Sequence, residues 1–290
     1  MGCARILLLS ALFADAGSSP GLQSAPQGAG TAPRIQPEPV RDAGASLSSD
    51  QARDVSALRK AADQGHAEAQ FQLGFAYDYG RGVPQDFAAA ARWYRKAADQ
   101  GHANAQAGLA NAYDYGQGVP EDHTEAIRLY KKAADRGSVW AQSHLGDAYS
   151  KGEWVPQDLA EAARWYKKAS DQGDAAAQSN LGLVYDNGWG VPQDHAEAVR
   201  WYTKTAHQGD TFAQFSLANA YHQGRGVAQD QAKAYFWANL AATLTENAEQ
   251  HSFVKLRDSI SAKLSRSQLT AINKKCRQWM DAFETRKGAK

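Results

Sequence analysis

The chain has 290 residues, of which 32 are basic and 31 acidic, so its formal net charge at pH 7 is only +1. This balance provides no overall field to attract nucleic acid or an anionic membrane surface, and we expect neither as a partner. Only two cysteines occur, Cys3 and Cys276, and their separation argues against a disulfide framework.

The first 16 residues are similar to a short secretory leader. Arg5 precedes an uncharged run at residues 6–14, and Ala14 and Ala16 have the spacing of small residues at a cleavage site. The run is too short to span a bilayer. We therefore predict an exported protein, periplasmic or secreted, without membrane insertion of the mature chain. A cytoplasmic protein is the alternative.

Residues 17–46 have a different composition. They are rich in Gly, Ala, Ser, Pro and Gln and contain few large apolar side chains. Such a segment cannot bury enough apolar surface to offset the conformational entropy that ordering would cost. We predict a disordered linker here.

Residues 47–244 are organised by one period. A glycine returns every 36 residues, and self-similarity at this length indicates stacked two-helix units rather than one globular core. Asp50 stands 36 residues before the equivalent Asp86, so residues 50–64 form half a unit that covers the first complete one. The repeated glycines are Gly65, Gly101, Gly137, Gly173 and Gly209.

Each unit, numbered from its glycine, contains the signals of two helices. Apolar or small residues at positions 5, 9, 12 and 13 mark the buried face of a first helix, helix A. A glycine at position 16 suits the left-handed residue that ends such a helix. Position 22 is always aspartate, a preferred N-cap, and it begins helix B, whose buried stripe runs through positions 26, 29, 30 and 33.

Residues 245–286 are predicted to form capping helices. Apolar residues recur with helical spacing from Phe253 to Leu264, and Ser265 with Gln268 makes a box-like start to a second helix. These helices would cover the last unit. They are also the surface through which a homo-oligomer could form.

The repeated residues resemble a known family. The pattern A-x-A-Q-x-x-L-G-x-x-Y-x-x-G-x-G-V-x-x-D-x-x-x-A-x-x-W-Y, read from Ala67 to Tyr94, resembles the Sel-1-like repeat, a relative of the tetratricopeptide repeat. The resemblance covers Asp50 to about Leu244. It implies an all-α fold, a right-handed α-solenoid whose A helices line a concave face, and an adaptor role in the assembly of other proteins.

Motifs of catalysis and cofactor binding are missing from the sequence. It has no H-E-x-x-H, Walker loop or G-x-S-x-G pattern. We therefore predict a noncatalytic scaffold or adaptor, with no metal or cofactor, that binds a protein or peptide segment in the groove lined by the A helices. The alternative is a hydrolase of cell-wall or peptide substrates that uses groove carboxylates such as Asp114 and Asp147.

The candidate binding face consists of positions 4, 7, 11 and 14 of helix A, opposite its core stripe. Aromatic residues are mixed there with acids and amides, and aromatic side chains are common anchors of recognition surfaces. The alternative is that these rings wedge into the neighbouring unit. Trp154 replaces a loop glycine and Trp189 a polar loop residue, and each is either a contact or a local plug. The candidate partner-binding residues are Phe71, Phe75, Asp78, Asn111, Asp114, Trp140, Asp147, Phe212, Phe215 and Asn219.

Overall fold

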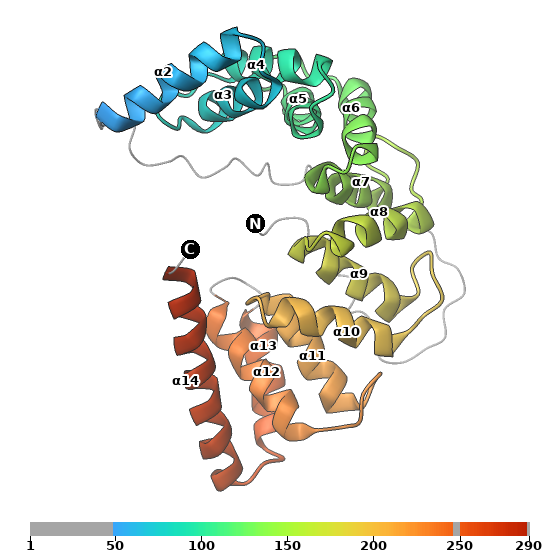
Figure 1. The fold of residues 1–290 in the computed structure, drawn as a ribbon. Helices are drawn as coiled ribbons and strands as arrows, with labels where there is room; N and C mark the ends of the chain where they lie inside the picture. The colour runs from blue at the N-terminus through green and yellow to red at the C-terminus, as the bar shows by residue number, and fades with distance from the viewer. Residues whose placement is uncertain (1–48, 246–249, 289–290) are drawn as a thin grey trace.

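A computed structural model of the protein describes residues 49–245 and 250–288. The predicted leader and linker lie outside these residues. The described part of the chain forms thirteen helices and no strand, arranged as an arc of stacked helix pairs (Figure 1). The protein is therefore an α-solenoid, as its period predicts.

Helix A and helix B alternate through five complete units. The A helices are α3 (Ala67–Tyr79), α5 (Ala103–Tyr115), α7 (Val139–Lys151), α9 (Ala175–Asn187) and α11 (Thr211–Gln223). The B helices are α4 (Phe87–Asp99), α6 (His123–Asp135), α8 (Leu159–Asp171), α10 (His195–Ala206) and α12 (Gln231–Leu244). The half unit is α2 (Ser49–Asp63), and α13 (Gln250–Ser261) and α14 (Arg266–Gly288) follow the last unit.

The ends of these helices are fixed by the repeated residues. The aspartate at position 22 caps each B helix, because its carboxylate accepts a hydrogen bond from a backbone N–H three residues later. Asp158, for example, accepts from the Glu161 N–H at 2.9 Å. The glycine at position 16 ends each A helix with a φ between 64° and 73°. A larger residue would be strained there, which explains the glycine in every unit.

The units stack through small residues and one large ring. The leucine at position 9 is buried in each unit, and Leu145 has no exposed surface (0%). The tyrosine at position 30 lies against helix A of its own unit, where a glycine leaves room in three units. A Cβ atom on Gly146 would lie only 2.5 Å from Cδ1 of Tyr166. This close packing leaves little freedom in how helix A and helix B of a unit fit together.

Successive A helices contact one another from α3 to α9, whereas successive B helices lie farther apart. The A helices therefore lie on the inner side of the arc in Figure 1 and the B helices on its outer side. At the ends of the stack, α2 packs on α3, and α13 and α14 pack on α12. Helix α13 also contacts α11, as a further A helix would.

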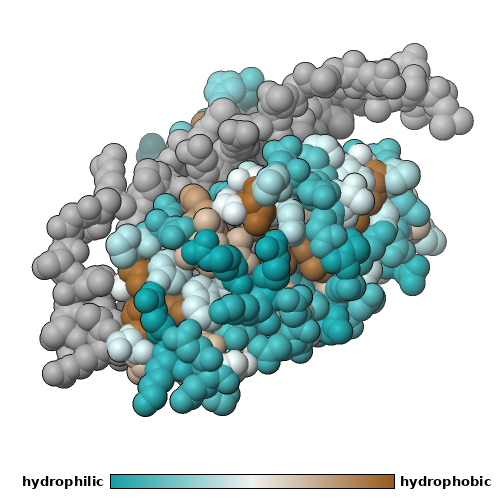
Figure 2. All heavy atoms as spheres, turned by 90° about the horizontal axis from the view of Figure 1, so that it is seen from above, coloured by the Kyte–Doolittle hydropathy of each residue, from teal (hydrophilic) through white to brown (hydrophobic). Residues whose placement is uncertain are grey.

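The C-terminal helices begin and pack as their residues indicate. The Gln268 side-chain oxygen accepts from the Ser265 N–H at 2.9 Å, and the Ser265 hydroxyl accepts from the Gln268 N–H at 3.3 Å. Cys276 is buried, with 1% of its surface exposed. None of the helices in the described residues is long and apolar enough to cross a membrane. Seen from above, the described surface shows apolar residues scattered among polar ones (Figure 2).

Candidate functional site

The predicted binding residues differ in how far they reach solvent. Trp140 is the most open, with 38% of its surface exposed. Phe212 is only 4% exposed and belongs to the core, so the prediction of an outward-facing ring is wrong at this position. The other predicted residues are half-buried: Phe71, Phe75, Asp78, Asn111, Asp114, Asp147, Phe215 and Asn219.

The phenylalanines at both ends of the stack pack against neighbouring helices. Phe71 stacks on His102 of the next unit, with 4.8 Å between the ring centroids. Phe215 stacks on Phe253 of α13 at 4.5 Å, and Phe212 lies edge-on to Tyr202 at 6.3 Å. These rings join neighbouring elements, which is the packing alternative to a binding role. Phe75 differs, because it lies under the guanidinium of Arg81 at 4.9 Å.

Units 2 and 3 supply two rings that pack against the exposed Trp140. Tyr130 and His144 stack nearly parallel, with 5.1 Å between ring centroids and 7° between ring planes. Trp140 lies edge-on to both rings, at 6.3 Å from Tyr130 and 5.2 Å from His144. A buried tyrosine and a half-buried histidine therefore hold an exposed indole in place. This arrangement reduces the entropy that Trp140 would lose on binding a partner.

A second aromatic contact lies beside this group. The ring of Trp154 covers that of His123, with 3.4 Å between centroids and 8° between planes, while 57% of Trp154 stays exposed. Trp154 has a φ of 61° and is the only non-glycine residue in the described part of the chain with a positive φ. A left-handed backbone at a large side chain is costly and is frequent at functional sites.

Position 18 shows why this residue is unusual. In the other units it is glycine, and in units 2, 4 and 5 this glycine lies against the start of the preceding B helix: a Cβ on Gly190 would be 2.3 Å from the Ala160 nitrogen. A tryptophan cannot adopt that approach. In unit 3 the side chain of Trp154 instead lies over His123, the first residue of the preceding B helix.

Carboxylates link the two aromatic groups. The Asp114 carboxylate lies 3.1 Å from His123 Nδ1, and the Glu121 carboxylate lies 3.1 Å from Nε2 of the same ring. Burial raises the pKa of Asp114, although the bond to His123 acts in the opposite direction. The charge of Asp114 also acts on His144 and Tyr130, which places this carboxylate between the two groups.

The third acid of the region is held by the next helices. Asp147 accepts a hydrogen bond from the Tyr166 hydroxyl at 2.6 Å and another from Asn180 Nδ2 at 3.3 Å. Burial raises the pKa of Asp147, and the Tyr166 bond opposes that shift. In unit 1 the Tyr94 hydroxyl donates to Asp78 at 3.1 Å in a similar way.

We define the central cluster as the residues of units 2 and 3 that these contacts bring together. His144 and Tyr130 are uncharged at neutral pH, because desolvation lowers the pKa of His144 to about 4 and raises that of Tyr130. The Tyr130 hydroxyl has no hydrogen-bond partner among the described residues. The central cluster consists of Asp114, His123, Tyr130, Trp140, His144 and Trp154. We add Asp147, because its charge acts together with that of Asp114 on Tyr115.

The chemistry of this cluster suits recognition more than catalysis. Its carboxylates Asp114 and Asp147 are each engaged by a side chain of the protein, and Tyr166 holds the second at 2.6 Å. Within the described residues there is no group of three or more His, Cys, Asp or Glu side chains placed to hold a metal ion. Exposed tryptophans are frequent anchors of recognition surfaces, and the acids beside them are half-buried and hydrogen-bonded.

The sequence did not identify every member of the cluster. His123 and Tyr130 lie on α6, outside the predicted face of helix A. One signal was present: an aspartate at position 14 is followed nine residues later by histidine in units 2 and 4, as Asp114 by His123 and Asp186 by His195. Both pairs are in contact, the second at 2.7 Å. Trp189, the other loop tryptophan, packs against the core of the last units.

A scan against protein families identifies the repeat. The model described as Sel1 repeat matches residues 58–66, 67–102, 103–138, 141–174, 175–210 and 211–245. The chain belongs to the Sel1 repeat family. The resemblance found in the sequence is thereby confirmed, including its five complete units, each of which the matched segments cover in whole or in large part.

One solved structure supports this assignment, and two others are similar in sequence. A Sel1 repeat protein from Oxalobacter formigenes is 33% identical, with a TM-score of 0.60 over 68% of this chain and 87% of that one. A putative Sel1 repeat protein from Klebsiella pneumoniae is 25% identical, with a TM-score of 0.44 over 71% of this chain and 99% of that one. A protective antigen of uropathogenic Escherichia coli with the same fold is 27% identical, with a TM-score of 0.35 over 82% and 67% of the chains. A search of curated proteins found no match.

Proposed function

We propose that the protein is a noncatalytic scaffold that binds a partner segment across its A helices, at the central cluster. Sel1 repeat proteins are generally protein-interaction scaffolds and mostly lack catalysis. The observation that carries the proposal is the exposed Trp140, 38% open and held by the Tyr130 and His144 rings. Tryptophan in a fixed orientation is the commonest kind of hot-spot anchor.

The surrounding charges favour a basic segment. Acids occur in the same region: Glu121 pairs with His123 under Trp154, and the charges of Asp114, Asp147 and Glu153 all act on Tyr115. Glu121 and Glu153 are the exposed ones, and exposed acids that meet lysine or arginine of a partner mainly accelerate association.

The test uses peptides selected from a displayed random library against the purified protein. Their dissociation constants are then measured by fluorescence anisotropy for the parent, for Trp140→Ala and for a matched control, Tyr79→Ala. Tyr79 is exposed to the same extent, 38%, but lies in unit 1, outside the central cluster. We expect Trp140→Ala to weaken binding at least about 30-fold, equivalent to about 2 kcal/mol, and Tyr79→Ala to change it less than about threefold.

Two results would overturn the proposal. Selected peptides that bind Trp140→Ala as tightly as the parent would place the binding surface elsewhere. Failure to enrich any basic, tryptophan-dependent peptide would mean that the A helices present only packing surface. Circular dichroism of each variant serves as the control for folding, because Trp140 is open enough that its loss should leave the helices intact.

A further inference from the structure

A second site is suggested by the way the outer side of the arc is packed. Four of the five units have tryptophan at position 29 of helix B, and three of these tryptophans lie under the lysine at position 32. The Nζ atom is 4.1 Å from the ring centroid for Lys96 on Trp93, 4.0 Å for Lys168 on Trp165 and 4.0 Å for Lys204 on Trp201. The indole fills the space between consecutive units, and the lysine covers it through a cation–π contact.

Unit 2 lacks this ring. Position 29 is Leu129, and the equivalent lysine, Lys132, has neither a ring to cover nor a hydrogen bond or ion pair with any described residue. A pocket of 390 Å³ opens at this place between α4, α5 and α6, with Leu129 and Leu109 in its wall. This volume is within the range of small-molecule binding sites.

A second departure occurs in the same pocket. Position 36 is glutamine in units 1, 3 and 4, and it donates to the glutamine at position 6 of its own unit. The distance is 2.7 Å for Gln100 as donor and 2.8 Å for Gln172 as donor. In unit 2 the residue is Arg136, which makes the same contact with Gln106 Oε1 at 3.2 Å. A guanidinium has five N–H donors, so Arg136 keeps most of them for another acceptor.

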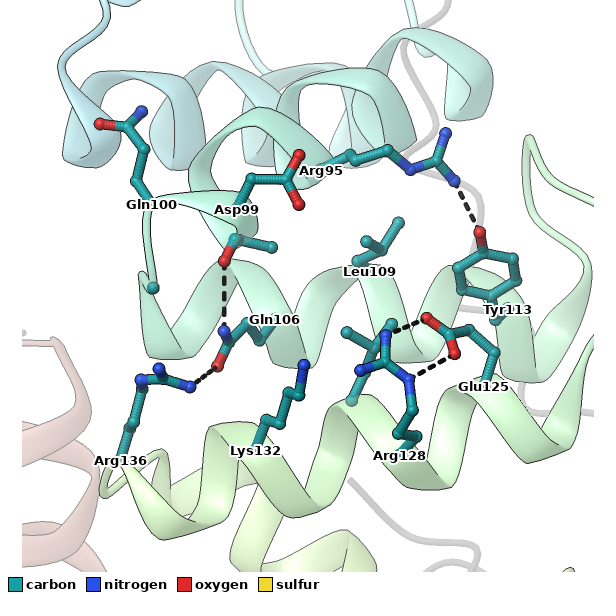
Figure 3. Close-up of a pocket in the computed structure, with 13 residues that line it drawn as sticks. Arg95, Asp99, Gln100, Gln106, Leu109, Tyr113, Glu125, Arg128, Lys132 and Arg136 are labelled. Atoms are coloured by element: carbon teal, nitrogen blue, oxygen red, sulfur yellow. Dashed lines mark hydrogen bonds and ion pairs between the residues drawn. The ribbon is translucent and has the colours of Figure 1, made fainter.

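The remaining charges leave the pocket positive. Figure 3 shows Lys132 and Arg136 extending from α6 into the space, with Asp99 on the opposite side. Arg128 donates two hydrogen bonds to the Glu125 carboxylate, the one from Nε at 2.6 Å, so its charge is neutralised. Arg95 donates to the Tyr113 hydroxyl at 2.7 Å. Four cationic and two anionic side chains line the pocket, on a chain whose net charge is +1.

We propose that this pocket binds an aromatic ring that carries a carboxylate. The ring takes the space of the missing indole, between Leu109 and Leu129 and beneath Lys132, as the tryptophans do in the other units. The carboxylate pairs with the unused donors of Arg136. The two departures of unit 2 thus supply the two halves of one binding site. This site is separate from the central cluster and does not depend on the proposed scaffold function.

Two kinds of ligand combine an aromatic ring with a carboxylate: a free aromatic acid and the C-terminal aromatic residue of a peptide. The probes are indole-3-acetate and Gly-Gly-Trp, the second with a free or an amidated C-terminus. Each carries a fluorine label and is followed by its ¹⁹F resonance. Tryptamine, which has the ring but a positive charge, is the control probe. Each is titrated into the full chain, the variants Leu129→Trp and Arg136→Gln, and the control Arg164→Gln, which removes an exposed arginine of unit 3.

We expect the acid to bind the parent with a dissociation constant on the order of 1 mM or below, given the usual affinity per atom of small ligands. Leu129→Trp should abolish binding, since it restores the ring of the other units, and Arg136→Gln should weaken it about tenfold. Arg164→Gln should leave it unchanged. Tighter binding of the free tripeptide than of indole-3-acetate would assign the ligand to a peptide terminus, and the reverse order to a free acid.

Three results would overturn the inference. These are no resonance shift with either carboxylate probe at several times 1 mM, undiminished binding to a folded Leu129→Trp, and equal binding of tryptamine. Leu129→Trp introduces the residue that four units already have, so it should fold. If it does not, Arg136→Gln, which introduces the residue of units 1, 3 and 4, decides alone: unchanged affinity refutes a carboxylate site.

Discussion

Neutral His144 in the central cluster makes stability depend on pH in a predictable way. Burial lowers the pKa of His144 to about 4, whereas the unfolded chain has a histidine pKa of about 6.5. Between these values the unfolded chain holds more protons at this site than the folded chain. The free energy of unfolding therefore falls as the pH drops through this window, and the contribution is lost completely below about pH 4.

The size of the effect follows from the width of the window. From pH 6.5 to pH 5, each pH unit costs about 1.4 kcal/mol, so the loss is roughly 2 kcal/mol. Charged groups around the ring are Asp114 and Asp174, which favour its protonation, and Lys151, which opposes it. Burial raises the pKa of Asp114 and of Asp147, so their protonation raises the free energy of unfolding as the pH falls. This gain partly masks the effect of the histidine on the pH dependence of stability.

A comparison with His144→Phe isolates the histidine. Phenylalanine keeps a ring to stack on Tyr130 but cannot titrate. Urea unfolding is followed by circular dichroism at pH 7 and pH 5 for both proteins. We expect the parent to lose roughly 2 kcal/mol more than the variant between the two pH values. Equal losses would show that His144 is not buried as a neutral ring and would refute the reasoning.

Three further predictions concern packing, strain and export. Gly146→Ala should lower the free energy of unfolding by about 1–3 kcal/mol in urea titrations, because its Cβ would lie 2.5 Å from a tyrosine ring. This loss should exceed the roughly 1 kcal/mol by which alanine favours a helix, and a stabilised variant would contradict the prediction. Trp154→Gly should keep or raise the melting temperature, since glycine tolerates the φ of 61°. The same variant should bind the selected peptides more weakly, and unchanged peptide affinity would remove Trp154 from the proposed binding surface. N-terminal sequencing of the exported protein should begin near Gly17, and a chain recovered from the cytosol with Met1 intact would end the export hypothesis.

The architecture was predictable because its determinants are local and repeated. A helix start needs one side-chain acceptor, as in Asp158, and a helix end needs one residue that tolerates positive φ, as in Gly152. Both signals occur at the same offsets in every unit. The fold class and the family are therefore confirmed, and the reciprocal cap at Ser265 and Gln268 is present as its spacing indicates.

The exposure of the predicted binding residues was less predictable, because it depends on the neighbouring helix. Phe212 has the same position in its unit as Trp140, yet the first is 4% and the second 38% exposed. Helical periodicity gives the same orientation for both and cannot distinguish them. Phe215 likewise meets Phe253 of α13, a contact between segments that no spacing rule connects. The predicted binding role of these residues remains a prediction, supported best at Trp140.

Variation between units is a better guide to function than the pattern they share. The shared residues, such as the position 16 glycines and the position 22 aspartates, are required in every unit because each unit must end its helices and pack on the next. A departure that keeps the stack intact is not required by packing. Trp154 accepts a strained backbone where glycine would relax it. Leu129 with Arg136 replaces a groove filled by an indole with an open one in which arginine stands in place of glutamine. Both departures cost packing or strain within the fold, and a binding partner at each place would account for them.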